Sequence, residues 1–300
     1  MAILVDENTR VLVQGITGRE GSARARFMLD YGSKVLGGVT PGRGGSKVWG
    51  LPVFNNVIEA KEELGPIDAS VTFVPGPSVK EAVVEAIEAG IKFILVPAER
   101  VPLHDSLEMI ALGNKKGTRI LGPGSLGLLS AGKAAMGWLG GSDDFAREIF
   151  KPGPVGVMSR SGGQTSTVVW SLMRAGIGIT TALHVGAEPV LGSSFSEILP
   201  LFECDEDTKV VVLFGEIGTI AEEEAAELIE EGRFTKPLVA YIAGRTLPAG
   251  IRFSHASAII EGGRGTAESK VKALERVGAY VVGRPQDIAV VLEGILKAVK

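Results

Sequence analysis

The chain of 300 residues is poor in the residues that support several common kinds of site. Its one cysteine, Cys204, excludes an intramolecular disulfide framework and a zinc site built from several cysteines. Lysine and arginine total 31 against 35 aspartates and glutamates, so nucleic acid is not an expected partner. The sequence also lacks an apolar run of about 18 residues and a leader-like N-terminus, so we expect no membrane span, no signal peptide and a cytoplasmic location.

Three patterns with well-defined chemistry are also missing. There is no P-loop, no H-E-x-x-H zinc pattern and no G-x-S-x-G nucleophile elbow. The sequence therefore predicts neither a metal site nor a nucleoside triphosphate site on this chain.

The arrangement of apolar residues predicts an α/β protein. Hydrophobic residues make up 45% of the chain and charged residues 22%, which is typical of a soluble globular protein. Short apolar runs alternate with amphipathic stretches, a pattern that predicts βαβ units and parallel sheets. We predict two parallel-sheet domains, over 1–130 and 154–300, joined by a linker over 131–153. The predicted strands are 10–14, 34–39, 69–74, 92–97, 119–122, 155–158, 180–185, 209–214, 238–243 and 279–282, and the clearest helices are 79–89, 165–175, 220–231, 268–277 and 285–299.

Three glycines follow the first predicted strand, at Gly15, Gly18 and Gly21. Glycines at a strand-to-helix turn let a diphosphate approach the helix N-terminus, where free amides and the helix dipole favour anions. The spacing differs from the dinucleotide fingerprint G-x-G-x-x-G, and tight packing explains such a turn equally well. The turn alone does not decide between a ligand site and packing.

The second predicted strand ends without the acidic residue that would hold the ribose of NAD. A glycine-rich loop with two cations, Arg43 and Lys47, stands in its place. This composition suits a ligand with an extra phosphate on its ribose, such as coenzyme A or NADP. The alternative is a solvated basic loop.

Several polar or glycine-rich segments follow the strands of the second domain. Because ligands collect at the carboxyl ends of parallel strands, these segments predict one site. Ser161, Gly162 and Gly163 open a helix and can bind a phosphoryl group, or they can simply cap that helix. Glu216 follows an apolar strand and can accept a hydrogen bond from an imidazole, or it can cap the next helix.

His255 is one of three histidines and lies among small residues before a glycine-rich loop. An accessible imidazole in such a segment can act as a nucleophile and carry a group covalently, although a lone histidine in a loop often has no such role. His104 and His184 are interpreted as structural. Without a nucleotide motif on this chain, a phosphorylated His255 would need its phosphoryl group from a partner subunit.

Taken together, these segments resemble the alpha subunit of succinyl-CoA synthetase and its relatives over essentially the whole chain. The matching pieces are Val13-Gln-Gly-Ile-Thr-Gly18, Gly38-Val-Thr-Pro-Gly-Arg-Gly-Gly45, Ser159-Arg-Ser-Gly162, Gly215-Glu-Ile-Gly218 and His255-Ala-Ser-Ala-Ile-Ile260.

The resemblance implies a Rossmann-like CoA-binding domain followed by a flavodoxin-like ligase domain, acting as an acid–thiol ligase within a hetero-oligomer. His255 would carry a phosphoryl group, supported by Glu216, with Ser161, Gly162 and Gly163 holding the phosphate. ATP and Mg²⁺ would sit on an ATP-grasp domain of a larger partner subunit. The implied CoA-binding residues are Thr17, Gly18, Arg19, Glu20, Arg43, Pro97, Ala98 and Glu99.

Some departures from the succinyl-CoA synthetase motifs are similar to ATP-citrate lyase. The family's S-R-S-G-T-L-T-Y is Ser159-Arg-Ser-Gly-Gly-Gln-Thr-Ser166 here, and the lyase also carries S-R-S-G-G. Gly163 and Ser166 leave a larger, polar acid pocket, with Ser166 as a substrate residue. We therefore expect citrate as the carboxylic acid, as in citryl-CoA synthetase. Succinate, a non-catalytic CoA-binding protein and an NADP oxidoreductase remain alternatives, as do ATP and GTP.

Overall fold

The computed structural model describes residues 2–245 and 264–298 and contains two sheets of seven strands each. The first sheet has the order β3-β4-β2-β1-β5-β6-β7 and is parallel except for the β3–β4 hairpin at its edge. Its strands are β1 (Val11–Gln14), β2 (Val35–Val39), β3 (Lys47–Val48), β4 (Leu51–Phe54), β5 (Ala69–Thr72), β6 (Phe93–Leu95) and β7 (Arg119–Leu121). Its helices are α1 (Arg19–Tyr31), α2 (Val57–Leu64), α3 (Val79–Glu88) and α4 (Leu103–Lys116), with a short 3-10 turn over Gly76–Ser78.

The second sheet has the order β14-β13-β12-β10-β11-β8-β9. Its strands are β8 (Gly127–Ser130), β9 (Ala134–Gly137), β10 (Pro152–Ser159), β11 (Ile179–His184), β12 (Val210–Glu216), β13 (Leu238–Ala243) and β14 (Tyr280–Val281). Its helices are α5 (Asp143–Ile149), α6 (Gly162–Arg174), α7 (Phe195–Cys204), α8 (Ala221–Glu230), α9 (Ala267–Arg276) and α10 (Asp287–Ala298). Strands β10 to β14 are parallel, and the β8–β9 hairpin adds two antiparallel strands at the edge.

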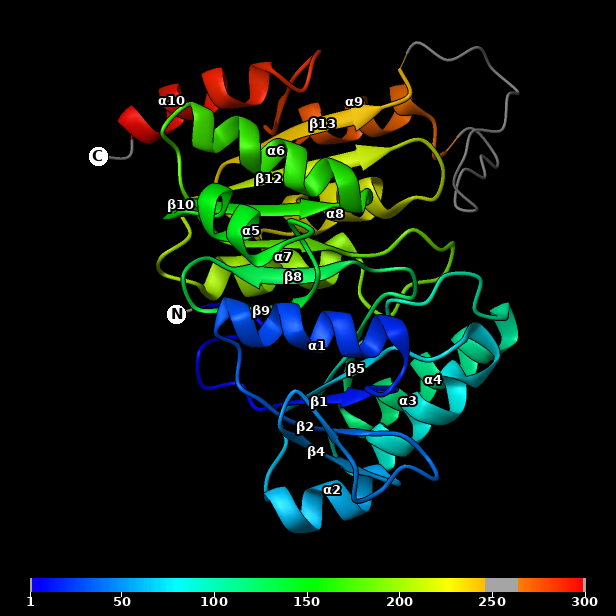
Figure 1. The fold of residues 1–300 in the computed structure, drawn as a ribbon. Coiled ribbons are helices and arrows are strands. Elements are labelled where there is room, and N and C mark those ends of the chain that lie inside the picture. The colour runs from blue at the N-terminus through cyan, green and yellow to red at the C-terminus, as the bar shows by residue number, and fades with distance from the viewer. Residues whose placement is uncertain (1, 246–263, 299–300) are drawn as a thin grey trace.

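Both strand orders agree with the predicted fold class. In the first sheet the order reverses at β1, as in a Rossmann-like unit, and β10 to β14 follow the flavodoxin-like order. The arrowheads of β1, β12 and β13 point to the same side of the molecule (Figure 1). The carboxyl ends of both sheets, where ligands bind in such folds, therefore face one side.

Residues 127–137 differ from the predicted layout. Strand β8 comes from the predicted first domain but pairs with β11, and the predicted linker 131–153 contains β9, α5 and the start of β10. The hydroxyl of Ser33, just after α1, donates to the carbonyl of Ala135 at 2.6 Å. This bond connects the hairpin to the first unit, which is the first sheet with helices α1 to α4; the second unit is the second sheet with helices α5 to α10. Strand β8 has only four residues and β9 consists mostly of small ones, so neither gives an alternating pattern and the sequence did not reveal them. Where the chain divides into domains stays a prediction.

One hydrophobic cluster extends through both units, and a second lies within the first unit alone. Along β1, Leu12 packs with α2, α3 and α4, whereas Val11 and Val13 belong to a cluster that includes α1 and extends into the second sheet. Figure 1 shows α1 lying between the first sheet and the β8–β9 hairpin. Burial of both faces of a parallel sheet explains why its strands are continuously apolar. Within residues 2–245 and 264–298, no helix is both long enough and apolar enough to cross a membrane.

Candidate functional site

The turn between β1 and α1 holds three glycines, and packing requires two of them. A Cβ on Gly15 would lie 2.3 Å from the carbonyl oxygen of Phe73, and a Cβ on Gly21 would lie 2.1 Å from that of Gly15. Gly18 differs, because its φ of −70° suits any residue and a Cβ there would meet its nearest atom at 3.3 Å. It is exposed and has no side chain to cover the first amides of α1. This helix end is therefore open to an anionic ligand.

A basic loop, defined here as residues 40–47, lies beside this turn. The hydroxyl of Thr17 donates to that of Thr40 at 3.1 Å, which joins the loop to the start of α1. Arg43 and Lys47 are exposed, and neither forms an ion pair within the described part of the chain. Two unpaired cations therefore stand beside the positive end of a helix, an arrangement that attracts phosphate.

Arg19 and Glu20 open α1, and the structure gives them different surroundings. The Arg19 side chain is 94% exposed and can reach a ligand, although its Nε lies 3.6 Å from Glu20 Oε1. Glu20 is also paired with Arg24 one helical turn later, at 3.1 Å. Glu20 therefore has a local role in the first turn of the helix whether or not it contacts a ligand.

Pro97, Ala98 and Glu99 follow β6 and lie at the same edge of the first sheet. Pro97 is buried, Ala98 is half-buried and Glu99 is exposed. The next residue, Arg100, has a φ of +56° and donates its backbone N–H to Glu188 Oε1 at 2.6 Å. Glu188 belongs to the segment after β11, so this contact links the first unit to the carboxyl edge of the second sheet.

The turn between β10 and α6 forms the corresponding helix end in the second sheet. The hydroxyl of Ser159 receives the backbone N–H of Ser161 at 2.9 Å, and the Ser161 side chain makes no capping hydrogen bond. A Cβ on Gly162 would lie 2.3 Å from Leu126 Cδ1, so packing requires this glycine. Gly163 is exposed and has no atom within 4 Å of a Cβ position. The space above this helix end is open.

Glu216 ends β12 and lies close to a buried arginine that the sequence did not single out. The side chains of Arg160 and Glu216 are 2% and 15% exposed, and Arg160 Nε lies 3.9 Å from Glu216 Oε1. Arg160 Nε has no hydrogen-bond partner among the described residues, and its Nη2 donates only a long 3.4 Å bond to the carbonyl of Glu188. A buried guanidinium bonded this weakly places positive charge beside Glu216 and the start of α6. An arginine between two serines gives no sequence pattern that reveals its burial.

A second group that the sequence did not reveal fixes the main chain around Glu216. The ammonium of Lys270 donates to the carbonyls of Glu216 at 2.7 Å and Gly218 at 2.6 Å, and to the carboxylate of Glu222. The side chains of Lys270 and Glu222 are both 0% exposed. Residues 54 positions apart in the chain make these contacts, so no local motif could have indicated them.

The hydrogen bonds of His184 fit the structural role expected for it, whereas the role of His104 stays a prediction. His184 Nδ1 accepts the N–H of Leu126 at 3.0 Å, and its Nε2 lies 3.0 Å from the carbonyl oxygen of Arg160. This pairing requires the neutral ring with its proton on Nε2. His104 is 82% exposed and contacts Glu108. His255 lies outside the described residues, so its place relative to Glu216 stays a prediction.

Ser166, the predicted substrate residue, lies one turn into α6 and is half-buried. Its hydroxyl accepts the backbone N–H of Gly140 at 3.2 Å. This contact ties α6 to the segment before α5. Ser166 therefore has a structural partner, and its role toward an acid stays a prediction.

One cluster in the described part of the chain has the composition of a metal site. His104, Asp105 and Glu108 bring their ligand atoms within 4.8 Å of one another. The ammonium of Lys80, however, lies 2.8 Å from Asp105 and 3.1 Å from Glu108, and hydrogen bonds to these two carboxylates raise the pKa of Lys80. A cation of the chain therefore already pairs with both carboxylates of this cluster.

Comparison with known sequences gives matches over both units. Residues 6–100 match the family model of a CoA binding domain, and residues 158–280 match that of CoA-ligase. The chain is 48% identical to succinate–CoA ligase [ADP-forming] subunit alpha 2 of Archaeoglobus fulgidus, over 99% of this chain and 100% of that protein. It is 42% identical to an ADP-forming sulfoacetate-CoA ligase subunit of Bilophila wadsworthia, over 99% and 100%.

Comparison with solved structures gives a close match of the fold. An ATP citrate lyase of Methanosaeta concilii in complex with (3S)-citryl-CoA superposes with a TM-score of 0.91 and 26% identity, covering 99% of this chain. The chain spans 51% of that lyase. A dinucleotide-forming acetyl-coenzyme A synthetase of Ca. Korarchaeum cryptofilum superposes with a TM-score of 0.76 and 21% identity, covering 96% of this chain and 61% of that one, a likeness of fold.

Proposed function

Since this chain belongs to the family of CoA-binding alpha subunits of ADP-forming CoA ligases, we propose that it joins succinate to coenzyme A. The observation that carries this choice of acid is the 48% identity, over the full length of both chains, to a succinate–CoA ligase subunit. The sequence motifs led us to expect citrate, but this chain is only 26% identical to the ATP citrate lyase of Methanosaeta concilii. Succinate therefore replaces citrate as the first candidate.

Coenzyme A binds at the carboxyl edge of the first sheet in this proposal. The open amides at Gly18 receive the diphosphate, with Thr17, Arg19 and Glu20 around them, and Arg43 faces the phosphate on the ribose. Pro97, Ala98 and Glu99 line the path toward the second sheet. Support comes from the open helix end, the unpaired Arg43 and the bond between Arg100 and Glu188, which brings the two sheet edges together.

A phosphoryl relay through His255 provides the chemistry. ATP, held with Mg²⁺ on a large ATP-grasp partner subunit, transfers its terminal phosphoryl group to the imidazole and leaves as ADP. The imidazole passes this group to the carboxylate of the acid, and the thiol of coenzyme A then displaces phosphate from the acyl phosphate. Glu216 orients the imidazole, while Ser161, Gly162 and Gly163 hold the phosphoryl group at the start of α6.

Thioester formation by the complex of this chain with its large subunit tests the proposal. With ATP and coenzyme A, we expect succinate to be used in preference to citrate and sulfoacetate. His255→Ala abolishes thioester formation and the acid-labile protein phosphate that ATP produces, while coenzyme A still binds. Full activity in this variant contradicts the relay, and absence of any phosphorylation or thioester with the native chain supports a non-catalytic CoA-binding protein.

Citrate is the second candidate, and the phosphate turn favours it. No atom lies within 4 Å of a Cβ position on Gly163, where succinyl-CoA synthetases carry threonine in S-R-S-G-T. The additional space suits a bulkier acid. A preference for citrate in the same assay reverses the order of the two acids and leaves the relay unchanged.

A further inference from the structure

Asn55, the residue that follows β4, is hydrogen-bonded to the main chain of the basic loop. Its Oδ1 accepts the backbone N–H of Gly42 at 3.1 Å and that of Gly44 at 3.0 Å. These are the two residues on either side of Arg43. One side-chain oxygen therefore fixes the main chain before and after the exposed arginine.

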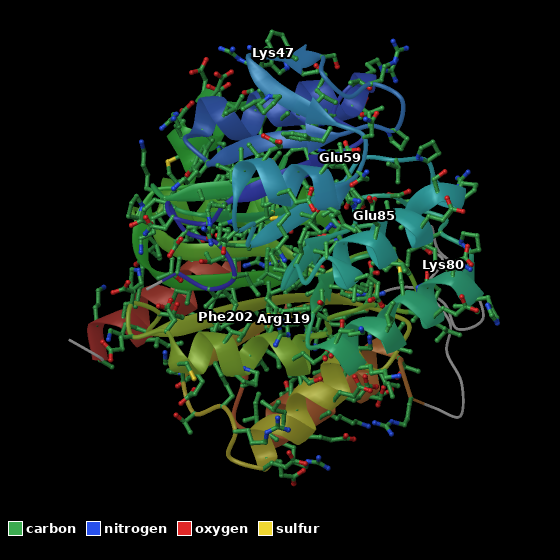
Figure 2. The ribbon with its side chains drawn as sticks, turned by 90° about the horizontal axis from the view of Figure 1, so that it is seen from below. Lys47, Glu59, Lys80, Glu85, Arg119 and Phe202 are labelled. Carbon is green, nitrogen blue, oxygen red and sulfur yellow. The ribbon has the colours of Figure 1, made fainter. Side chains whose placement is uncertain are left out.

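The fit between Asn55 and Gly44 is close. A Cβ on Gly44 would lie 2.3 Å from Asn55 Nδ2 and 2.8 Å from its Cγ. Asn55 is itself fixed, because its N–H donates to Glu59 Oε2 on α2 at 2.9 Å. Figure 2 labels Glu59 on this helix and Lys47 farther out, at the rim of the first unit. Asn55 thus joins the helix, through its backbone N–H, to the loop, through its side-chain oxygen.

The rest of the loop is also bonded through its main chain. The N–H of Arg43 donates to the carbonyl of Thr40 at 3.0 Å, and the carbonyl of Arg43 accepts the Ser46 hydroxyl at 2.7 Å. Beyond the loop, the indole N–H of Trp49 donates to the carbonyl of Ser22 on α1 at 2.8 Å. The main chain at Arg43 is held in one conformation while its guanidinium has no partner within the described residues.

When the backbone that carries an unpaired cation is already fixed, the loop loses little conformational entropy as the ligand binds. From these contacts we propose that Asn55 is a positioning residue that presents Arg43 to the phosphate on the ribose of coenzyme A. Asn55 thereby sets the preference for coenzyme A over dephospho-CoA, which lacks that phosphate. The inference rests on the proposed binding of coenzyme A by the first unit.

Loss of Asn55 leaves the N–H groups of Gly42 and Gly44 without their acceptor, and water is the nearest replacement. Both flanking glycines then lose the restraint that fixes Arg43. The affinity for the ribose phosphate falls, whereas contacts to the diphosphate at the start of α1 are made by other residues. A general loss of folding would weaken the binding of coenzyme A and of dephospho-CoA equally. The ratio of the two affinities therefore isolates the positioning role.

Calorimetric titration of the native complex and its variants with coenzyme A and dephospho-CoA tests this. One charged hydrogen bond to phosphate is expected to favour coenzyme A about 10- to 100-fold in the native protein, and Arg43→Ala removes this preference. Asn55→Ala is expected to reduce the preference at least about threefold and to change dephospho-CoA affinity less than about twofold. The double variant shows the preference of Arg43→Ala alone, because the two residues act through one contact.

Asn56→Ala is the matched control, because Asn56 Oδ1 accepts the N–H of Glu59 at 2.8 Å within α2 and makes no hydrogen bond to the basic loop among the described residues. It keeps the native preference. The Cβ introduced by Gly44→Ala displaces the side-chain amide of Asn55, so this variant disturbs the same contact from the loop. Its preference for coenzyme A over dephospho-CoA tests the inference if Asn55→Ala folds poorly. An unchanged preference in both Asn55→Ala and Gly44→Ala, or equal native affinities for the two ligands, overturns the inference. Failure of the native complex to bind coenzyme A contradicts the proposed function itself.

Discussion

Replacement of Lys270 by methionine tests how strongly the buried ion pair stabilises the second sheet. The Lys270 ammonium donates to Glu222 and to the carbonyls of Glu216 and Gly218, and both ion-pair side chains are 0% exposed. Methionine has a similar length but no donor. The carboxylate of Glu222 is then left buried without its cation, although its Oε1 still accepts the Glu216 N–H at 3.0 Å.

Removal of one partner from a buried pair costs about 3–5 kcal/mol of unfolding free energy. The two carbonyls that lose their donor add to this, at about 1–3 kcal/mol for each group left unsatisfied, so we expect the upper part of the range for Lys270→Met. Glu222→Leu removes the acid as well. Because an apolar pair of similar volume avoids the stranded charge, the double variant is expected to recover about 2–4 kcal/mol relative to the sum of the single losses.

Urea unfolding of the four proteins in this double-mutant cycle gives these energies, followed by tryptophan fluorescence. Ligase activity provides a second measurement. We expect Lys270→Met to lower it, because the main chain of Glu216 loses its bond to Lys270, and to leave the binding of coenzyme A unchanged. A loss below about 1 kcal/mol for Lys270→Met, or strictly additive single losses, would refute the assignment of a coupled buried pair.

Two other predictions concern stability. Gly162→Ala is expected to destabilise the protein by about 1–3 kcal/mol because its Cβ meets Leu126. Gly163→Ala has open space around its Cβ and is expected to stabilise α6 by up to about 0.5–1 kcal/mol. A higher unfolding temperature for Gly162→Ala than for Gly163→Ala contradicts this packing. Hydrogen bonds from Arg10 lower the pKa of Asp68, so its contribution to stability is present above the unfolded-state pKa and disappears as the pH falls through the folded-state pKa. In urea titrations, Asp68→Asn should therefore cost stability near neutral pH and none at lower pH, and a cost independent of pH contradicts this sign.

The parallel strands could be predicted because burial of both faces makes them continuously apolar. The predicted strand 209–214, for example, corresponds to β12, in which Val210 to Phe214 are all buried. The β8–β9 hairpin could not be predicted, since Ala134, Ala135 and Gly137 have no strand signature. Its pairing with β11 depends on contacts distant in the chain.

The candidate site divides in the same way. Glycine-rich turns such as Gly15 to Gly21 are local in sequence, so their position at a helix end could be predicted. The sequence did not, however, separate Gly15 and Gly21, which packing requires, from Gly18, which it does not. Arg160 and Lys270 were missed because their importance comes from burial beside Glu216, and burial of a charged side chain is a property of the tertiary structure.

The hydrophobic cluster shared by the two sheets constrains the distance between their two helix-end turns. The contact between Arg100 and Glu188 joins the two carboxyl edges directly, and α1 packs on the β8–β9 hairpin along the seam. The distance from the turn at Gly18 to the turn at Ser161 is therefore set by the packing that the two sheets share. In the proposed reaction, the long pantetheine arm of coenzyme A would carry its thiol across this distance toward the acyl phosphate.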